Sequence, residues 1–313
     1  MNQIKVISIN VNGLRSRELE LARFVIEQGN NCIYAISDTR LSQTSNMRNI
    51  EGYTLLRSDK KQTGPMATAG GVGLLVPEKW SCQEVNLSYR SEALEYIAAI
   101  IFPPDRNCQP LKIMSVYNHP DNYFPAELLS EFKNINLNGN VIPGLIAGDI
   151  NCPHVAFGSK SSNEYGNKFL QSLNNENLIF FNDGTPTYCS NSTGLMNVLD
   201  LVIGEPHTSP FIESCTVRGN IGSDHFPVIT TLKFRVSPVL RHKVNLKLWV
   251  SNVDKELEHV SLTHDLDSNV KVLNEIFEVS HEKSRLSATR KKRSLPAEIM
   301  NNTGCSIWTG KNY

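Results

Sequence analysis

The sequence predicts an α/β protein whose first 234 residues form a four-layer α/β sandwich, with two mixed β-sheets packed face to face and helices outside. Short apolar runs typical of buried strands recur throughout residues 1–234, and most are joined by short connections. Amphipathic stretches typical of helices intervene at only a few points. Many strands with few helices favour two packed sheets that carry their helices on the outer faces.

Bulk properties limit the protein classes to consider. The chain has 313 residues, about 40% of them hydrophobic, which suits one large domain or two ordinary ones. Its net charge of zero argues against binding to nucleic acid by bulk charge alone but allows a local basic groove. Seven cysteines without a C-x-x-C pair favour a reducing, intracellular compartment. We expect no signal peptide and no membrane span, which needs roughly 20 apolar residues.

The predicted elements of the first 234 residues follow from apolar runs and their boundaries. The predicted strands are 5–10, 32–36, 53–56, 70–76, 94–101, 111–116, 141–147, 178–181, 198–203, 211–217 and 226–232. The predicted helices are 16–28, 125–132 and 168–174. The first helix has an apolar face and a plausible stop at Gly29, and the second has a proline at its start.

The character of the sequence changes after residue 234. Residues 235–313 contain 13 Lys and Arg against 9 Asp and Glu, a surplus of four positive charges, so residues 1–234 carry four net negative charges. Apolar spacing within this segment is typical of amphipathic helices. The basic cluster at 290–293 is either a solvated helix end or a localisation or nucleic-acid contact. We therefore predict a catalytic domain at 1–234 and a helical or partly disordered linker at 235–313.

One stretch, residues 141–151, organises the candidate chemistry. An apolar run leads to Gly148, which permits a tight turn, and then to Asp149 and Asn151. Alternation along an extended chain places these two polar side chains on the same face. Such a pair at the end of a buried strand needs hydrogen bonds or a ligand. Taken alone, an Asp/Asn turn explains it equally well.

Other strand ends carry polar residues of the same kind. They are Asn10 and Asn12, Asp38, Tyr117 and Asn118, Asp200, and Asp224 with His225. If these ends converge, they form a cleft of oxygen ligands with one imidazole. Such ligands suit Mg²⁺ or Mn²⁺ better than zinc. A phosphodiester is a sensible substrate, because a metal offsets charge on phosphate while a carboxylate orients water.

The run Gly70-Gly71-Val72-Gly73 opens one of the predicted strands. A phosphate-cradling loop is conceivable there, but the sequence has no G-x-x-x-x-G-K-[ST] and no complete dinucleotide fingerprint. Glycines that permit close backbone packing are the favoured interpretation.

Four motifs together resemble a known family. They are Asn10-Val11-Asn12-Gly13-Leu14-Arg15, Gly148-Asp149-Ile150-Asn151 with His154, Leu199-Asp200-Leu201, and Ser223-Asp224-His225-Phe226-Pro227. Their order and spacing over residues 3–234 resemble the endonuclease/exonuclease/phosphatase superfamily. Within it, the sequence is most similar to the apurinic-endonuclease-like domain of non-LTR retrotransposon polyproteins.

The resemblance implies a role for each matching residue. Asn10 and Asp38 would lie at the metal, with Asp224 nearby. Asp149 would align or deprotonate water beside Asn151, Tyr117 would approach the scissile phosphate, and His225 would stabilise or protonate the phosphate while Asp200 holds its tautomer. The implied substrate contacts are Asn12, Arg15, Asn118 and His154.

The same resemblance implies an activity and partners. The enzyme would use Mg²⁺, or Mn²⁺, to nick one strand of double-stranded DNA in the nucleus, leaving a 3′-hydroxyl that primes reverse transcription within a larger polyprotein. An abasic-site repair endonuclease is the alternative enzyme, and a weakened DNA- or protein-binding relative is a third reading. Asp38 stands where the family usually has Glu, and its shorter side chain makes the expected rate penalty anything from negligible to about a thousandfold, roughly 4 kcal/mol.

Overall fold

The computed structural model describes residues 2–42, 44–45, 50–60, 69–105, 108–234, 246–258 and 260, and the pairs 272–273, 275–276 and 279–280. The chain divides into two compact units, Met1–Val236 and Ser237–Tyr313. In the second unit, α4 spans Leu246–Leu257, and the basic cluster at 290–293 lies outside the described residues. Within the part of the chain that the structure describes, no helix is long and apolar enough to cross a bilayer.

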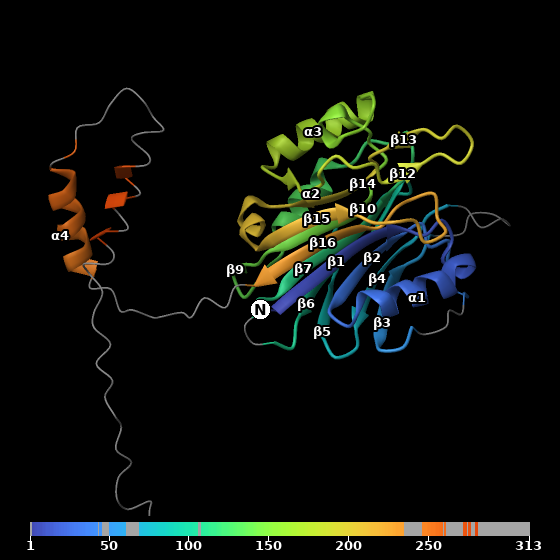
Figure 1. The fold of residues 1–313 in the computed structure, drawn as a ribbon, viewed down its shortest axis with the longest axis horizontal. Coiled ribbons are helices and arrows are strands. Elements are labelled where there is room, and N and C mark those ends of the chain that lie inside the picture. The colour runs from blue at the N-terminus through green and yellow to red at the C-terminus, as the bar shows by residue number, and fades with distance from the viewer. Residues whose placement is uncertain are drawn as a thin grey trace, which may run out of the picture. The chain divides into compact units, whose positions relative to one another are not determined.

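The first sheet has the strand order β15-β16-β1-β2-β4-β3 (Figure 1). Its strands are β1 (Asn2–Asn10), β2 (Cys32–Ser37), β3 (Tyr53–Ser58), β4 (Val72–Pro77), β15 (Ile212–Val217) and β16 (Val228–Phe234). The sheet is mixed, because β1 pairs in parallel with β2 and antiparallel with β16.

The second sheet has the order β11-β14-β10-β7-β6-β5. Its strands are β5 (Ser81–Val85), β6 (Leu94–Phe102), β7 (Leu111–Asn118), β10 (Gly144–Asp149), β11 (Ile179–Phe180) and β14 (Asp200–Gly204). Here β10 pairs in parallel with β7 and antiparallel with β14. Two small hairpins complete the strands, β8 (Asn136–Leu137) with β9 (Asn140–Val141) and β12 (Tyr188–Cys189) with β13 (Met196–Asn197).

Helices cover the outer faces of both sheets. They are α1 (Glu18–Gln28), α2 (Ala126–Lys133) and α3 (Glu164–Asn175), with 3-10 helices η1 (Leu14–Arg17), η2 (Val155–Phe157) and η3 (Pro206–Phe211). Apolar side chains of α1 pack on the first sheet, and those of α2 and α3 pack on the second. Figure 1 shows where the three helices lie. Between the sheets lies a third apolar layer. The arrangement confirms the predicted four-layer α/β sandwich.

The layer between the sheets turns polar at one end. Along β10, Leu145 and Ala147 face this inner layer, and alternation puts Asp149 on the same side. On β14, Val202 faces inward, so Asp200 does too. Inner-facing polar groups therefore appear where the apolar core ends, and the fold gathers them without any long loop.

Several element boundaries differ from those predicted. The helix expected at 168–174 begins at Glu164, because the Asn163 side chain accepts a hydrogen bond from the Gly166 backbone N–H at 2.8 Å and caps the helix. Strand β5 was not predicted, since its side chains are largely exposed and form no apolar run. Gly148 lies inside β10 and makes no turn. A Cβ there would overlap the Val116 backbone, so the glycine is required by the close approach of β10 to β7.

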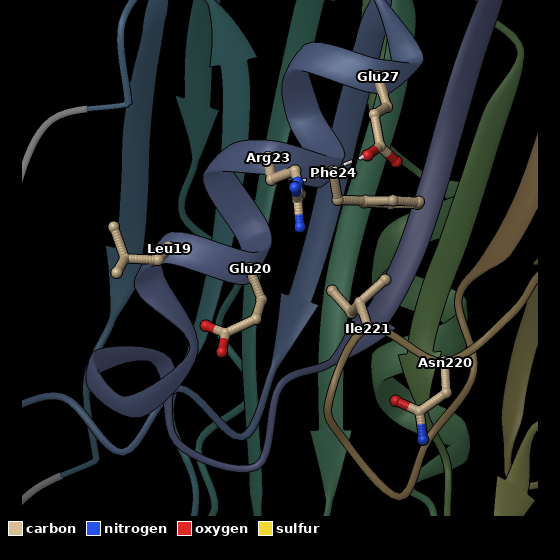
Figure 2. Close-up of a pocket in the computed structure, with 7 residues that line it drawn as sticks. All are labelled: Leu19, Glu20, Arg23, Phe24, Glu27, Asn220 and Ile221. Carbon is tan, nitrogen blue, oxygen red and sulfur yellow. Dashed lines mark ion pairs between the residues drawn. The ribbon is translucent and has the colours of Figure 1, made fainter.

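The loop before β16 rests against α1. The two segments line a shallow pocket (Figure 2). The lining residues are Leu19, Glu20, Arg23, Phe24, Glu27, Asn220 and Ile221. None of the predicted site residues lines this pocket, and the Arg23–Glu27 ion pair across its α1 side is largely exposed, with N and O 4.0 Å apart.

Candidate active site

Four neighbouring strands of the second sheet carry a row of polar side chains at the end of the inner layer. The strand register pairs Asp200 with Asp149, Asp149 with Tyr117, and Tyr117 with Glu95. Asn10, at the end of β1 in the first sheet, faces this row across the inner layer and donates a hydrogen bond from Nδ2 to Asp149 Oδ2 at 2.8 Å. Residues 139 positions apart in sequence thus meet in one site.

Asp149 is the buried centre of the row, with 2% of its surface exposed. Its Oδ1 has no hydrogen-bond partner among the described residues. Burial raises the pKa of Asp149 to about 7, although the neighbouring His225 opposes the shift. Leaving a buried carboxylate oxygen without a partner costs roughly 1–3 kcal/mol. The site is therefore arranged to accept a water molecule or a cation at this oxygen.

His225 bridges two carboxylates. Its Nδ1 lies 2.7 Å from Asp200 Oδ2 and its Nε2 lies 3.8 Å from Asp149 Oδ2. Burial by itself lowers the pKa of His225, but Asp200 and Asp149 outweigh it and raise the pKa to about 10. The ring also packs against Tyr188, with ring centroids 4.9 Å apart. His225 is therefore a buried imidazolium at neutral pH, with Nδ1 committed to Asp200.

The loops after β1 and before β16 meet above this pair. Asn12 Nδ2 donates to Asp224 Oδ1 at 3.0 Å, and the Asn12 backbone N–H donates to Asn10 Oδ1 at 2.9 Å. Asn12 has a φ of 46°, a left-handed conformation that asparagine tolerates better than most residues. Ser223 Oγ accepts from the His225 N–H and lies 3.3 Å from Asp224 Oδ1. Asp224, Asn12, Asn10 and Asp149 thus form one continuous hydrogen-bonded chain.

Asn118 and Asn151 hold the neighbouring loops in place. Asn118 Nδ2 donates to Ile150 O at 2.9 Å and to Asn122 O at 3.1 Å, and Asn151 Nδ2 donates to Asn118 O at 2.8 Å. Asn118 Oδ1 is buried and has no partner among the described residues. Both amides therefore position the backbone on either side of Asp149, and Asn118 keeps one acceptor open.

Tyr117 lies between the carboxylates of the row. Burial, Asp38, Asp149 and Glu95 all raise the pKa of its hydroxyl. The tyrosine therefore stays protonated and remains a hydrogen-bond donor.

Asp38 is held outside the hydrogen-bonded chain. Its Oδ1 accepts from the Gly70 N–H at 2.6 Å, and its Oδ2 accepts from Arg40 Nε and Nη2 at 3.1 and 2.9 Å. Asp38 and Arg40 have φ values of 52° and 51°, a strained turn that brings the two side chains together. The carboxylate predicted to bind a metal is therefore already paired with a guanidinium.

Two predicted contacts lie apart from this chain. His154 accepts from the Ala156 N–H at Nδ1, 2.9 Å away, and so caps η2. Arg15 is exposed in η1. Within the described residues, neither side chain makes a polar contact with Asp149, Asp200 or His225.

The residues present fit a divalent cation in part. Asp149, Asp200 and His225 gather their polar atoms within 4.8 Å of one another, and Oδ1 of both aspartates is buried without a hydrogen-bond partner in the described part of the chain. The two carboxylates are the candidate ligands, because His225 as an imidazolium has no free lone pair. Such oxygens suit Mg²⁺ or Mn²⁺. Of the three ligands predicted, Asn10 and Asp224 lie in the chain that contains Asp149. Asp38 fits less well, because both of its oxygens already accept hydrogen bonds.

Sequence reasoning did not single out Thr187, Tyr188 and Arg40, which shape the site, and it named Ser223 only as part of the motif that contains His225. Thr187 Oγ1 accepts from the Asp200 N–H at 2.9 Å, Ser223 orients His225, Tyr188 packs on its ring, and Arg40 pairs with Asp38. Of the three residues that were missed, only Arg40 carried a signal, an arginine two residues after a strand-end carboxylate. Thr187 acts through its hydroxyl and Tyr188 through its ring, and both residue types are common in loops.

Comparison with known proteins agrees with this architecture. Residues 111–229 match the family model described as endonuclease-reverse transcriptase. The endonuclease domain of TRAS1, a telomere-specific non-LTR retrotransposon, has a TM-score of 0.57 and 17% identity, over 74% of this chain and 99% of that one. The domain has the endonuclease/exonuclease/phosphatase fold.

Two further structures share the endonuclease/exonuclease/phosphatase fold. The AP endonuclease LMAP from Leishmania major has a TM-score of 0.56 and 14% identity, over 74% of this chain and 88% of that one. The catalytic domain of APE2 from Xenopus laevis has a TM-score of 0.52 and 14% identity, over 75% and 94%. At identities this low, the structural match establishes a common fold and nothing further. A search of curated proteins gives no match.

Proposed function

We propose that the endonuclease/exonuclease/phosphatase domain is a metal-dependent DNA endonuclease that nicks one strand and leaves a 3′-hydroxyl. The observation that carries the proposal is the buried Asp200–His225 pair against Asp149, whose Oδ1 has no hydrogen-bond partner within the described residues. Phosphodiester hydrolysis needs a carboxylate that aligns water and a donor for the phosphate oxygens. This arrangement offers both.

Each residue has a defined part in the proposal. Asp149 aligns the attacking water through Oδ1, and Asn10 fixes the carboxylate through Oδ2. His225 donates from Nε2 to a phosphate oxygen, while Asp200 holds Nδ1. A Mg²⁺ bound beside Asp149 supplies positive charge that offsets the charge building on the phosphate.

The choice of DNA as partner rests on similarity. The matching family model is described as endonuclease-reverse transcriptase, and TRAS1 is a retrotransposon. We therefore propose double-stranded DNA as the substrate, a retrotransposon polyprotein as the wider context, and the nucleus as the location. The nick would then prime reverse transcription.

A plasmid-nicking assay with Mg²⁺ tests the function. Wild type is expected to convert supercoiled plasmid to the relaxed form, and Asp149→Asn to lose at least about 100-fold in rate, because the amide aligns water poorly. Glu78→Gln is the matched control. It makes the same kind of acid-to-amide change at an exposed residue beyond the far end of β4, so its nicking rate should equal that of wild type. Equal nicking by wild type and Asp149→Asn would contradict the site assignment.

Abasic-site cleavage is a second candidate, supported by the similarity to the AP endonuclease LMAP. Duplexes that differ only by one abasic site separate the two functions. A rate on abasic DNA far above that on intact duplex would favour repair. Comparable rates favour the proposed nicking function.

The pairing of Asp38 with Arg40 supports a third candidate, a weakened relative that binds DNA or a protein. Asp38→Glu adds the methylene that the family position usually has. Mn²⁺ binding by calorimetry and plasmid nicking are measured together. If wild type does neither and Asp38→Glu does both, the weakened reading holds; if wild type does both, it fails.

A further inference from the structure

Beyond Tyr117, on the β6 side of the row, lies a cluster that the proposed mechanism does not use. His119 Nε2 is 3.1 Å from both carboxylate oxygens of Glu95 and 3.2 Å from Lys60 Nζ. The His119 ring meets the Tyr117 ring edge to face, with centroids 4.9 Å apart. The cluster is therefore in direct contact with the candidate active site.

The fold builds this cluster from three strand ends. Glu95 is in register with Tyr117, His119 follows β7, and its backbone N–H donates to Ala93 O at 2.9 Å. Lys60 follows β3. Gly70 makes room for it, because a Cβ at Gly70 would lie 2.9 Å from both Glu95 Oε1 and Lys60 Cδ, and its φ is 132°. The prediction that the glycines at 70–73 permit close packing thus agrees with Gly70, which packs directly against Glu95 and Lys60.

The contacts of His119 Nε2 with Glu95 and with Lys60 cannot both be hydrogen bonds at once. One ring nitrogen cannot donate to Glu95 and accept from Lys60 at the same time. Lys60 Nζ has three N–H groups and donates one to Ala69 O at 3.1 Å. When His119 donates to Glu95, the ammonium has N–H groups without an acceptor among the described residues. Lys60 is half-buried, so part of the residue lies at the surface.

We propose that Lys60, with His119 beside it, binds the backbone phosphate next to the scissile phosphate. The inference rests on the proposed function, which puts the scissile phosphate beside Asp149 and His225, and on Tyr117, the next residue of the row, which we also take to face that phosphate. Neighbouring strands lie about 4.8 Å apart, so the cluster lies about one strand spacing beyond Tyr117, on the scale of one nucleotide step. An ammonium and an imidazole are suitable partners for a phosphate oxygen.

Charge supports this reading. Residues 1–234 carry four net negative charges, so DNA binding by this domain needs cations placed at individual phosphates. Glu95 lies 3.1 Å from His119 and has 10% of its side chain exposed, so its carboxylate is committed to the imidazole rather than to solvent.

Metal-free DNA binding tests the proposal without relying on catalysis. The full chain is titrated in EDTA against a fluorescein-labelled duplex by anisotropy, over a series of salt concentrations. Lys60→Met is expected to weaken binding about tenfold at moderate salt and to lower the slope of log K against log salt by about one. Lys60→Arg should keep both values.

Lys79→Met is the matched control, because Lys79 is exposed beyond the opposite end of β4. It should leave the affinity and the slope unchanged. Unfolding midpoints of all variants are compared, and if Lys60→Met does not fold, Lys60→Gln replaces it. Equal slopes for wild type and the folded Lys60 variant would overturn the proposal.

A single neutral methylphosphonate locates the contact. It is moved along the strand through the positions flanking the nick. The loss caused by Lys60→Met should disappear at one flanking position only, because that phosphate no longer carries the charge that Lys60 binds. Disappearance at no position, or equally at all, contradicts a single-phosphate site.

The two proposals fail in different ways. If the protein does not nick but Lys60→Met still lowers the salt slope, the phosphate site stands and the endonuclease proposal fails. If the protein nicks and the slope is unchanged, the phosphate site fails alone.

Discussion

At the scale of single residues, the imidazole of His225 is defined by what surrounds it. Asp200 lies 2.7 Å from Nδ1, and Asp149 lies 3.8 Å from Nε2. The two carboxylates reverse the effect of burial and raise the pKa to about 10. The ring is thus protonated at neutral pH, with Nδ1 bound to Asp200 and Nε2 directed toward Asp149.

This raised pKa predicts a pH dependence of stability. The ordinary pKa of histidine is 6.5, so the interaction contributes fully below pH 6.5 and is lost as pH rises toward 10. In metal-free protein, wild type should therefore exceed Asp200→Asn in free energy of unfolding by more at pH 6 than at pH 9.5, with a difference on the order of a few kcal/mol. Urea unfolding at both pH values measures it.

An NMR titration of the histidine ring provides the companion measurement. Asp200→Asn should lower the pKa of His225, because burial then meets less opposition. An unchanged pKa in that variant would show that Asp200 does not control the ring.

Some residues of the candidate site could be predicted from the sequence, and others could not. Asp149, Asp200 and His225 could be named because each is a polar group where an apolar run demands a partner. The partners of Asp38 could not be read, since its pairing with Arg40 depends on two positive φ values. Glu95 and His119 were missed because nothing in the sequence gives the register of β6 on β7.

At the scale of elements, an ion pair at the other end of the second sheet joins three segments. Lys112, at the start of β7, is fully buried, and its Nζ lies 2.7 Å from Glu205 Oε2 after β14. The same ammonium donates to Lys133 O and Ile135 O at the end of α2. The absence of a side chain at Gly144 leaves room for the lysine stem.

Lys112→Met is expected to destabilise the domain by about 3–5 kcal/mol, because it leaves Glu205 buried without its cation. The double variant with Glu205→Gln should recover part of the loss. Denaturant unfolding measures both, and the nicking rate of folded protein should match wild type since Tyr117 lies at the opposite end of β7. Equal stability of wild type and Lys112→Met would contradict a structural ion pair.

Element boundaries show why some structure escaped the sequence. Strands with continuous apolar faces, such as β2 and β4, were located to within about two residues. Strand β5 and the hairpin β12–β13 are short and half-exposed, so they carry no periodic signal. The caps were similarly hidden, and α3 begins where Asn163 supplies an acceptor.

At the scale of the whole molecule, the unit Met1–Val236 contains both six-stranded sheets and every predicted site residue. Its three apolar layers lie between the sheets and beneath the helices. These features supply a complete core, which is what an independently folding domain requires.

We therefore expect residues 1–236, expressed alone, to unfold at the same midpoint as the corresponding transition of the full chain. Calorimetry and plasmid nicking measured side by side check this expectation. Loss of solubility, or a midpoint lowered by more than about 5 °C, would show that residues 237–313 contribute to the core.

The row from Asp200 to Glu95 has one broader consequence. Its members belong to four adjacent strands, so the backbone hydrogen bonds between those strands set the separations of the side chains. The connections leaving those strands can change in length and composition while the distances between the four side chains stay the same. Substitutions and insertions in these connections are therefore compatible with an unchanged spacing of the four side chains.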